Sequence, residues 1–192
     1  MKSGLLMACV FSLISGVFGF KATAADYQVA EVYADLRKMV LETKPTDIGL
    51  KPSDAQMTVL GLLMETGYPE AVVTLVAIAD GTVSIYFSNG GGIIGLGPHE
   101  GPRRASEALL KLAPQFLKFC QPASSFPLPK PSNTRFYVLT NKGIVTAEVK
   151  EVDLVYGRHG LSPLFHKGHE LISEIRVVDE KLRAEPGAEL GR

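Results

Sequence analysis

One segment of the 192-residue chain has the pattern of a β-hairpin, and this constrains the fold more than any other feature. Residues 71–79 (AVVTLVAIA) are apolar on both faces and rich in β-branched side chains, as in a central strand. In residues 82–88, Val83, Ile85 and Phe87 alternate with side chains that carry a hydroxyl. The intervening Asp80-Gly81 is typical of a two-residue type I′ turn, which needs positive φ. Strands joined in this way are antiparallel, so the sequence predicts an antiparallel sheet.

The rest of the chain predicts three more strands and three helices around this hairpin. The expected elements are a helix over 27–43, a buried strand over 57–66, a helix that opens at Pro102 and is kinked or split at Pro114, strands over 135–140 and 144–149, and a last helix capped by Ser162. The apolar run 57–66 also fits a helix, because periodicity alone does not separate the two.

This order, α-βββ-α-ββ-α, predicts an α+β fold with a single antiparallel five-stranded sheet and helices packed on it. We expect one domain over residues 26–183 and a flexible tail over 184–192. The order βββ-α-ββ-α resembles the longin and profilin-like group, to which the roadblock domains are related by a permuted order. That resemblance implies a protein-binding role, because domains of this group mostly bind proteins.

Three segments also resemble those of bacterial hypothetical proteins with no assigned activity. They are residues 67–95 (GYPEAVVTLVAIADGTVSIYFSNGGGIIG), 135–140 (RFYVLT) and 161–172 (LSPLFHKGHELI). The resemblance implies a bacterial source and assigns no catalytic residue.

The first 25 residues differ in kind from the remainder. Lys2 is followed by an uncharged run from Gly4 to Phe20, and Ala22-Thr23-Ala24 forms an A-x-A site. This pattern predicts a signal peptide that is cleaved after Ala24 or Ala25, and export to the bacterial periplasm or medium. The alternative is an uncleaved N-terminal membrane anchor. After cleavage we expect no stable membrane span.

Composition excludes several classes of function. The chain has 20 Lys and Arg against 20 Asp and Glu, so it lacks the basic excess of a nucleic-acid partner. Cys9 lies in the predicted signal, which leaves Cys120 as a lone thiol without a disulfide partner. His166 and Glu170 are four residues apart, but this is not the H-E-x-x-H zinc motif. We therefore expect neither a metal nor another cofactor.

A glycine-rich loop is the most distinctive candidate site. Gly90, Gly91 and Gly92 could let backbone N–H groups converge on an anion, and Arg103 and Arg104 follow in the first turn of the next helix. Arg158 and His159, just before the last helix, could face the same loop. The alternative is that the glycines only supply the positive φ of a tight passage.

Two functions remain open from the sequence. The first is a non-catalytic binding or interaction module for a protein or small-molecule partner, because the sequence contains no G-x-S-x-G, Ser-x-x-Lys or C-x-x-C motif. The second is a binder of a small anion or phosphorylated ligand, or an enzyme, that uses the glycine loop, Arg103, Arg104 and a histidine. The second requires one of these arginines and either His159 or His166 around a single pocket.

Overall fold

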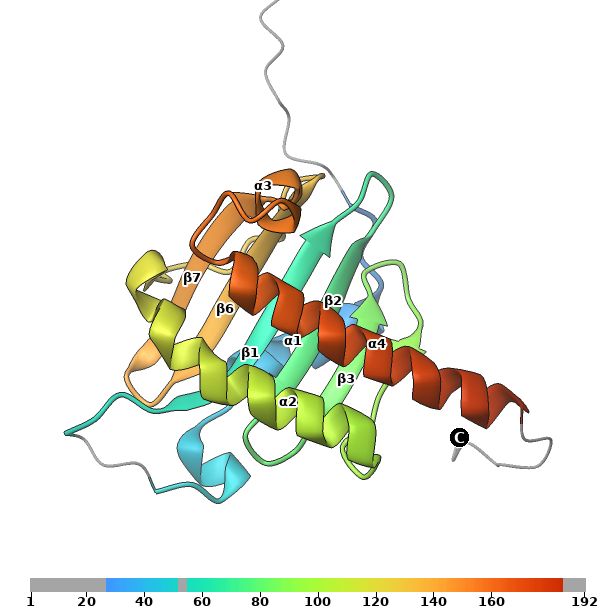
Figure 1. Cartoon of the computed structure of the whole chain (residues 1–192), viewed down its shortest axis with the longest axis horizontal. Coiled ribbons are helices and arrows are strands. Elements are labelled where there is room, and N and C mark those ends of the chain that lie inside the picture. The colour runs from blue at the N-terminus through green and yellow to red at the C-terminus, as the bar shows by residue number, and fades with distance from the viewer. Residues whose placement is uncertain (1–26, 52–54, 185–192) are drawn as a thin grey trace, which may run out of the picture.

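The computed structural model describes residues 27–51 and 55–184, which form one antiparallel sheet between two layers of helices. Helices α2 and α4 cover one face of the sheet and α1 lies behind the other, while α3 sits at one end (Figure 1). The strands are ordered β4-β3-β2-β1-β6-β7-β5. The N-terminal segment 1–25 and residues 185–192 of the predicted tail lie outside the described residues.

The bounds of the elements follow the predicted order closely. The helices are α1 (Glu31–Leu41), α2 (Glu100–Leu112), α3 (Glu151–Val155) and α4 (Ser162–Ala184), with 3₁₀ helices η1 (Pro45–Ile48) and η2 (Ala113–Phe119). The strands are β1 (Val59–Gly67), β2 (Val72–Ile78), β3 (Val83–Phe87), β4 (Gly92–Ile93), β5 (Gln121–Pro122), β6 (Asn133–Thr140) and β7 (Gly143–Lys150).

The α+β class and the antiparallel sheet agree with the prediction, but the sheet has seven strands and the predicted number of five is wrong. The two additional strands, β4 and β5, are two residues long and form the two edges. β4 lies within the glycine loop, and β5 lies at the start of the proline-rich segment, residues 121–133, which contains four prolines. Neither shows an alternating pattern, because each strand pairs only two residues with its neighbour and two residues are too few to show a period.

The β2–β3 hairpin forms, with a different turn from the predicted one. Gly81 has φ +94°, whereas Asp80 does not have positive φ, so the turn is not type I′. The Ile78 N–H donates to the Thr82 carbonyl at 2.9 Å, which encloses a three-residue loop ending in the left-handed glycine. The Asp80 carboxylate accepts from the Thr82 N–H at 2.8 Å and holds the turn.

Several helix boundaries also differ. α2 begins at Glu100, so Pro102 is its third residue. Its α-helical part ends at Leu112 and continues as η2, the split that Pro114 predicts. Residues 151–155, between the last predicted strand and the last predicted helix, form α3, and the Ser162 hydroxyl donates to the Asp153 carbonyl of α3 at 3.4 Å. Among the helices of the described residues, none has the length and apolar character to cross a membrane.

The two faces of the sheet are packed differently. On the α2/α4 face, side chains from the strands and from α2, α3 and α4 form a continuous apolar cluster that includes Leu62, Leu75, Leu109, Phe136 and Leu171. On the α1 face the cluster is smaller and contains three tyrosines, Tyr33, Tyr86 and Tyr137. Buried polar groups are therefore found mainly on the α1 face of the sheet.

Candidate functional site

A row of polar side chains crosses the α1 face of the sheet, one on each of the five long strands. Glu65 on β1 is paired in register with Thr74 on β2 and with Arg135 on β6. Thr74 is in turn paired with Tyr86 on β3, and Arg135 with Glu148 on β7. Because residues in register point to the same face, these five side chains form one continuous row.

Glu65 and Arg37 form a buried ion pair in the middle of this row. Arg37 on α1 donates from Nε to Glu65 Oε1 at 2.7 Å and from Nη2 to Oε2 at 3.0 Å. The Glu65 side chain is fully buried and that of Arg37 is 12% exposed. This bidentate geometry is the strongest form of an Arg–carboxylate contact. The salt bridge raises the pKa of the Arg37 guanidinium against the opposing effect of burial.

Two hydroxyls extend the pair toward α1. Thr74 Oγ1 donates to Glu65 Oε1 at 3.4 Å, so its oxygen accepts from the Tyr33 hydroxyl at 2.8 Å. Burial, with the nearby Glu65 charge, raises the pKa of the Tyr33 phenol well above its usual range. Tyr33 therefore stays a neutral donor. Two α1 side chains, Tyr33 and Arg37, thus fix the helix to the sheet through polar contacts.

Tyr137 connects the two charged pairs of the row. The guanidinium carbons of Arg37 and Arg135 lie 5.4 and 5.9 Å from the centroid of its ring. Its hydroxyl donates to the Pro127 carbonyl at 2.7 Å. Arg135 forms a salt bridge with Glu148, which also accepts from the Asn133 side chain at 2.6 Å. The row is therefore linked to the proline-rich segment as well as to α1.

Two hollows flank α1, and Tyr33 lies beneath both. One has a volume of about 290 Å³ and is enclosed between α1 and the proline-rich segment, with Val29, Leu41, Phe126 and Leu128 in its lining. The other has a volume of about 180 Å³ and lies between α1 and the β3–β4 turn, with Val32, Leu36, Phe87 and Ile94 in its lining. Both linings are mainly apolar side chains.

Large apolar side chains on α1 and near the two hollows remain in contact with solvent. Val32, Met39 and Ile94 are 58%, 67% and 64% exposed. In the sequence Val29, Val32 and Met39 recur at helical spacing together with Tyr33, but the structure buries Tyr33 and leaves these three exposed. We call the exposed set the α1 surface; it consists of Val29, Val32, Met39, Phe87, Ile94 and Phe126.

The predicted glycine loop lies against this surface. Gly90, Gly91 and Gly92 have φ of +97°, +85° and +144°, so the loop depends on backbone conformations that other residues rarely adopt. A Cβ on Gly92 would lie 2.5 Å from the Ile85 carbonyl oxygen, which shows how closely β4 approaches β3. All three glycines line the smaller hollow.

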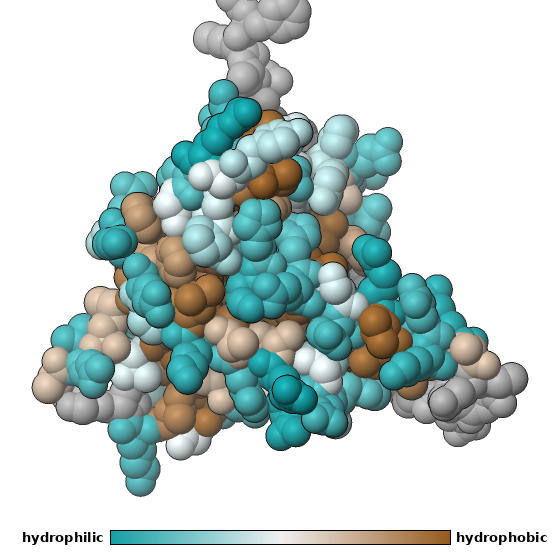
Figure 2. Space-filling model, viewed as in Figure 1, coloured by the Kyte–Doolittle hydropathy of each residue, from teal (hydrophilic) through white to brown (hydrophobic). Residues whose placement is uncertain are grey.

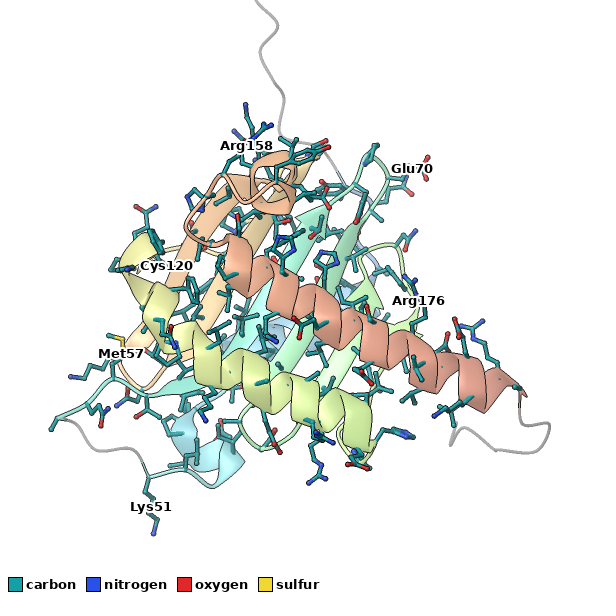
Figure 3. All side chains as sticks on the ribbon, in the orientation of Figure 1. Lys51, Met57, Glu70, Cys120, Arg158 and Arg176 are labelled. Carbon is teal, nitrogen blue, oxygen red and sulfur yellow. The ribbon has the colours of Figure 1, made fainter. Side chains whose placement is uncertain are left out.

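The predicted arginines and histidine are not brought together with the glycines. Arg103 and Arg104 lie on α2, across the sheet from α1, and the Arg104 guanidinium is 3.3 Å from Glu100. Arg158 lies next to α3, far from the start of α2 (Figure 3). Its guanidinium carbon is 5.0 Å from the centroid of the Tyr156 ring. The His159 ring packs on Phe119 at 6.1 Å, and its Nδ1 accepts from the Leu161 N–H at 3.1 Å.

The geometry thus divides the predicted set among at least three places on the molecule. The described residues also contain no group of three or more His, Cys, Asp or Glu side chains positioned to hold a metal ion. Lys167 pairs with Glu170 in the helix that carries His166. Burial raises the pKa of the Cys120 thiol to about 11, which disfavours the reactive thiolate.

Sequence reasoning missed Glu65 and Arg37, the centre of the buried row. The available signal was Glu65 itself, the one charged residue in the apolar run 57–66. An acid in a strand that is buried on both faces requires a paired base. The sequence offers no means to choose Arg37 among the basic residues, because the pairing depends on how α1 is laid across the sheet.

No family model, curated protein or solved structure matches the chain.

Proposed function

We propose that the chain is an exported, non-catalytic binding module whose α1 surface takes an extended segment of another protein. The observation that carries the proposal is the uncovered apolar side of α1 beside two apolar hollows. Grouped large apolar side chains in contact with water are characteristic of interaction sites. The class agrees with the protein-binding role that the longin-like element order implies.

The size of the hollows favours side chains of a protein over a small molecule. Pockets for small ligands usually measure about 300–1,000 Å³ and enclose most of the ligand. The two hollows, at about 290 and 180 Å³, lie below that range. Each instead has room for one large apolar side chain, the kind of anchor that supplies most of the binding energy at protein interfaces.

The position of the hollows on either side of α1 sets the spacing of the anchors. A helix with its side chains is about 10–12 Å wide. A segment in the polyproline II conformation advances about 9 Å in one turn of three residues. Two large apolar residues three positions apart lie on one face of such a segment, and their side chains, extended outward from backbone positions about 9 Å apart, can cover the remaining width of α1 and reach both hollows. This spacing is the signature that we expect in a bound peptide.

The buried row supplies the rigidity that such a site needs. Tyr33, which lies under both hollows, is fixed by its hydrogen bond to Thr74, and Arg37 is fixed by Glu65. Binding to a surface that is already ordered avoids part of the entropy cost of association. We infer that the polar row holds α1 in the position that keeps both hollows open.

A peptide library tests this proposal. Display peptides carrying two large apolar residues at different spacings would be selected on the purified protein, and their dissociation constants measured by fluorescence anisotropy. We expect peptides with a spacing of three to be enriched. The double variant Val32→Asp/Ile94→Asp is expected to weaken their binding by about tenfold or more, because it places charges in the contact.

The matched control places the same charges on another exposed apolar pair. Val152 and Val155 are both exposed on α3, so Val152→Asp/Val155→Asp should leave peptide binding unchanged. The proposal is wrong if no spacing is enriched, or if the selected peptides bind the Val32→Asp/Ile94→Asp protein as tightly as the wild type. Melting temperatures of both variants would establish that they remain folded.

A further inference from the structure

The opposite face of the molecule carries a third hollow, between the start of α2 and the end of α4. Its volume is about 850 Å³, which is larger than that of either hollow beside α1. The last turns of α4 extend past the β4 edge of the sheet (Figure 1). Figure 2 shows a hydrophobic patch among hydrophilic side chains near this part of α4. The end of α4 therefore presents an apolar surface that no other described element covers fully.

The residues that α4 contributes to this hollow form one stripe. They are Glu174, Val177, Val178, Lys181 and Leu182. Their spacing of three, four, seven and eight residues places them on the same side of the helix. Val177 is 44% exposed. The stripe thus has two valines at its centre, an acid toward its N-terminal end and a base toward its C-terminal end.

This arrangement of charge is complementary to itself. When two such helices pack antiparallel about a two-fold axis that passes between Val177 and Val178, Glu174 of each faces Lys181 of the partner subunit. The two valines then meet at the axis, and both salt bridges form at once. Such a contact is isologous, which is the arrangement found in most homodimers.

The hollow offers less to a small anionic ligand. Arg104 contributes the guanidinium group of this hollow, and that group already pairs with Glu100 at 3.3 Å. The Glu174 carboxylate lies over the first turn of α2, where a Cβ on Gly101 would be 2.3 Å from its Oε2. Glu174 is exposed, so its carboxylate repels a free anion at this position and can still meet a cation of the partner subunit.

We propose that two copies of this chain associate through antiparallel packing of residues 174–182 of α4, each helix end entering the hollow of the other copy. The contact uses the sheet face opposite the α1 surface, so both α1 surfaces of the dimer stay free. The proposal is thus independent of the peptide-binding proposal and can fail separately.

Charge reversal tests the pairing directly. The mass of the purified protein would be measured by analytical ultracentrifugation over a range of concentrations. We expect the wild type to pass from monomer to dimer. Glu174→Lys and Lys181→Glu should each weaken dimerisation by about tenfold or more, because each turns two attractions per dimer into repulsions. The combined variant Glu174→Lys/Lys181→Glu should restore it.

Two controls separate this contact from other causes. Glu180→Lys makes the same change of charge on α4 outside the stripe and should leave the dissociation constant within about twofold of the wild type. A chain that ends at Ala184 should still dimerise. The proposal is overturned if the wild type remains a monomer, if the combined variant does not recover, or if removal of residues 185–192 abolishes the dimer. Circular dichroism would confirm that each variant is folded.

Discussion

The two faces of the sheet are held to their helices by different forces. On the α2/α4 face, fully buried apolar side chains such as Leu75, Leu109 and Phe136 make the contact. On the α1 face, an ion pair and a hydroxyl pair connect a single helix to the sheet, while apolar side chains of that helix face solvent. Apolar packing is non-directional, whereas hydrogen bonds fix position. The first face thus supplies most of the stability, and the second determines where α1 lies.

The largest expected effect comes from breaking the buried pair on one side only. Arg37→Leu leaves the fully buried Glu65 carboxylate without its cation. Removal of one partner of a buried pair costs about 3–5 kcal/mol of unfolding free energy, chiefly through the charge that remains. The double variant Arg37→Leu/Glu65→Leu should regain most of this loss and come within about 1 kcal/mol of the wild type. Urea unfolding of the three proteins measures both values.

A pair of shape-conserving substitutions makes the contrast between the faces sharper. Leu109→Met keeps the side-chain volume on the apolar face and should cost less than about 1.5 kcal/mol. Glu65→Gln keeps the shape in the polar row but leaves Arg37 unpaired, so it should cost more. If both cost the same, or if Arg37→Leu is no less stable than the double variant, the α1 face is held by packing alone.

The glycine turn beside α1 is expected to show effects of intermediate size. Gly91 and Gly92 both have positive φ, but only at Gly92 would a Cβ meet backbone, 2.5 Å from the Ile85 carbonyl oxygen. Gly91→Ala should therefore cost about 1 kcal/mol, and Gly92→Ala more than about 2 kcal/mol. Thermal unfolding of the two variants compares them. Equal costs would mean that β4 does not pack on β3 as described.

The same measurement bears on the anion hypothesis. Arg103 and Arg104 lie across the sheet from the glycines, so phosphate should raise the melting temperature of neither the wild type nor the two glycine variants. A rise that is lost in both variants would restore the glycine loop as an anion site. The expected pattern assigns these glycines to backbone geometry.

The parts of the fold that could be predicted from sequence are those with a local cause. The β2–β3 hairpin, the split of the second helix at Pro114 and the order of the five long strands along the chain follow from turn residues and periodicity. β4 and β5 could not be predicted in this way, because two residues carry no period. The type of the hairpin turn also depends on the register of the flanking strands, which Asp80-Gly81 alone does not determine.

The candidate site shows the same division more clearly. The glycines were found because positive φ has a local signature, but their proposed partners were chosen from the properties of one helix terminus and one loop. Whether Arg104 meets an external anion or Glu100 depends on side-chain contacts that spacing merely permits. Val32 and Met39 share the helical repeat of the buried Tyr33 and are nevertheless exposed, because periodicity shows which residues share a side and not what covers them. The burial of Glu65 could not be predicted locally, because it depends on how α1 and the sheet pack together.

The smallest expected effect is a pH dependence of the unfolding free energy that arises on the α2/α4 face. His169 on α4 lies on the α2/α4 side, with its ring centroid 4.3 Å from that of Phe165 and with Nε2 buried and unpartnered. Burial, with a smaller contribution from the neighbouring His166, lowers the pKa of His169 from its usual 6.5. The unfolded chain therefore binds this proton more readily than the folded one. The stability that neutral His169 allows is complete above about pH 6.5 and decreases as the pH falls below that value.

The unfolding free energy of the wild type should thus decrease as the pH falls below about 6.5. In His169→Gln the decrease should be smaller, because the group that takes up the proton on unfolding is gone. His166→Gln removes only the second cause and should produce a slope between the two. An unchanged slope in His169→Gln would mean that its ring is solvated in the folded protein. In that case the apolar contact of α4 would be looser there than the close approach of Gly168 to Met64 implies.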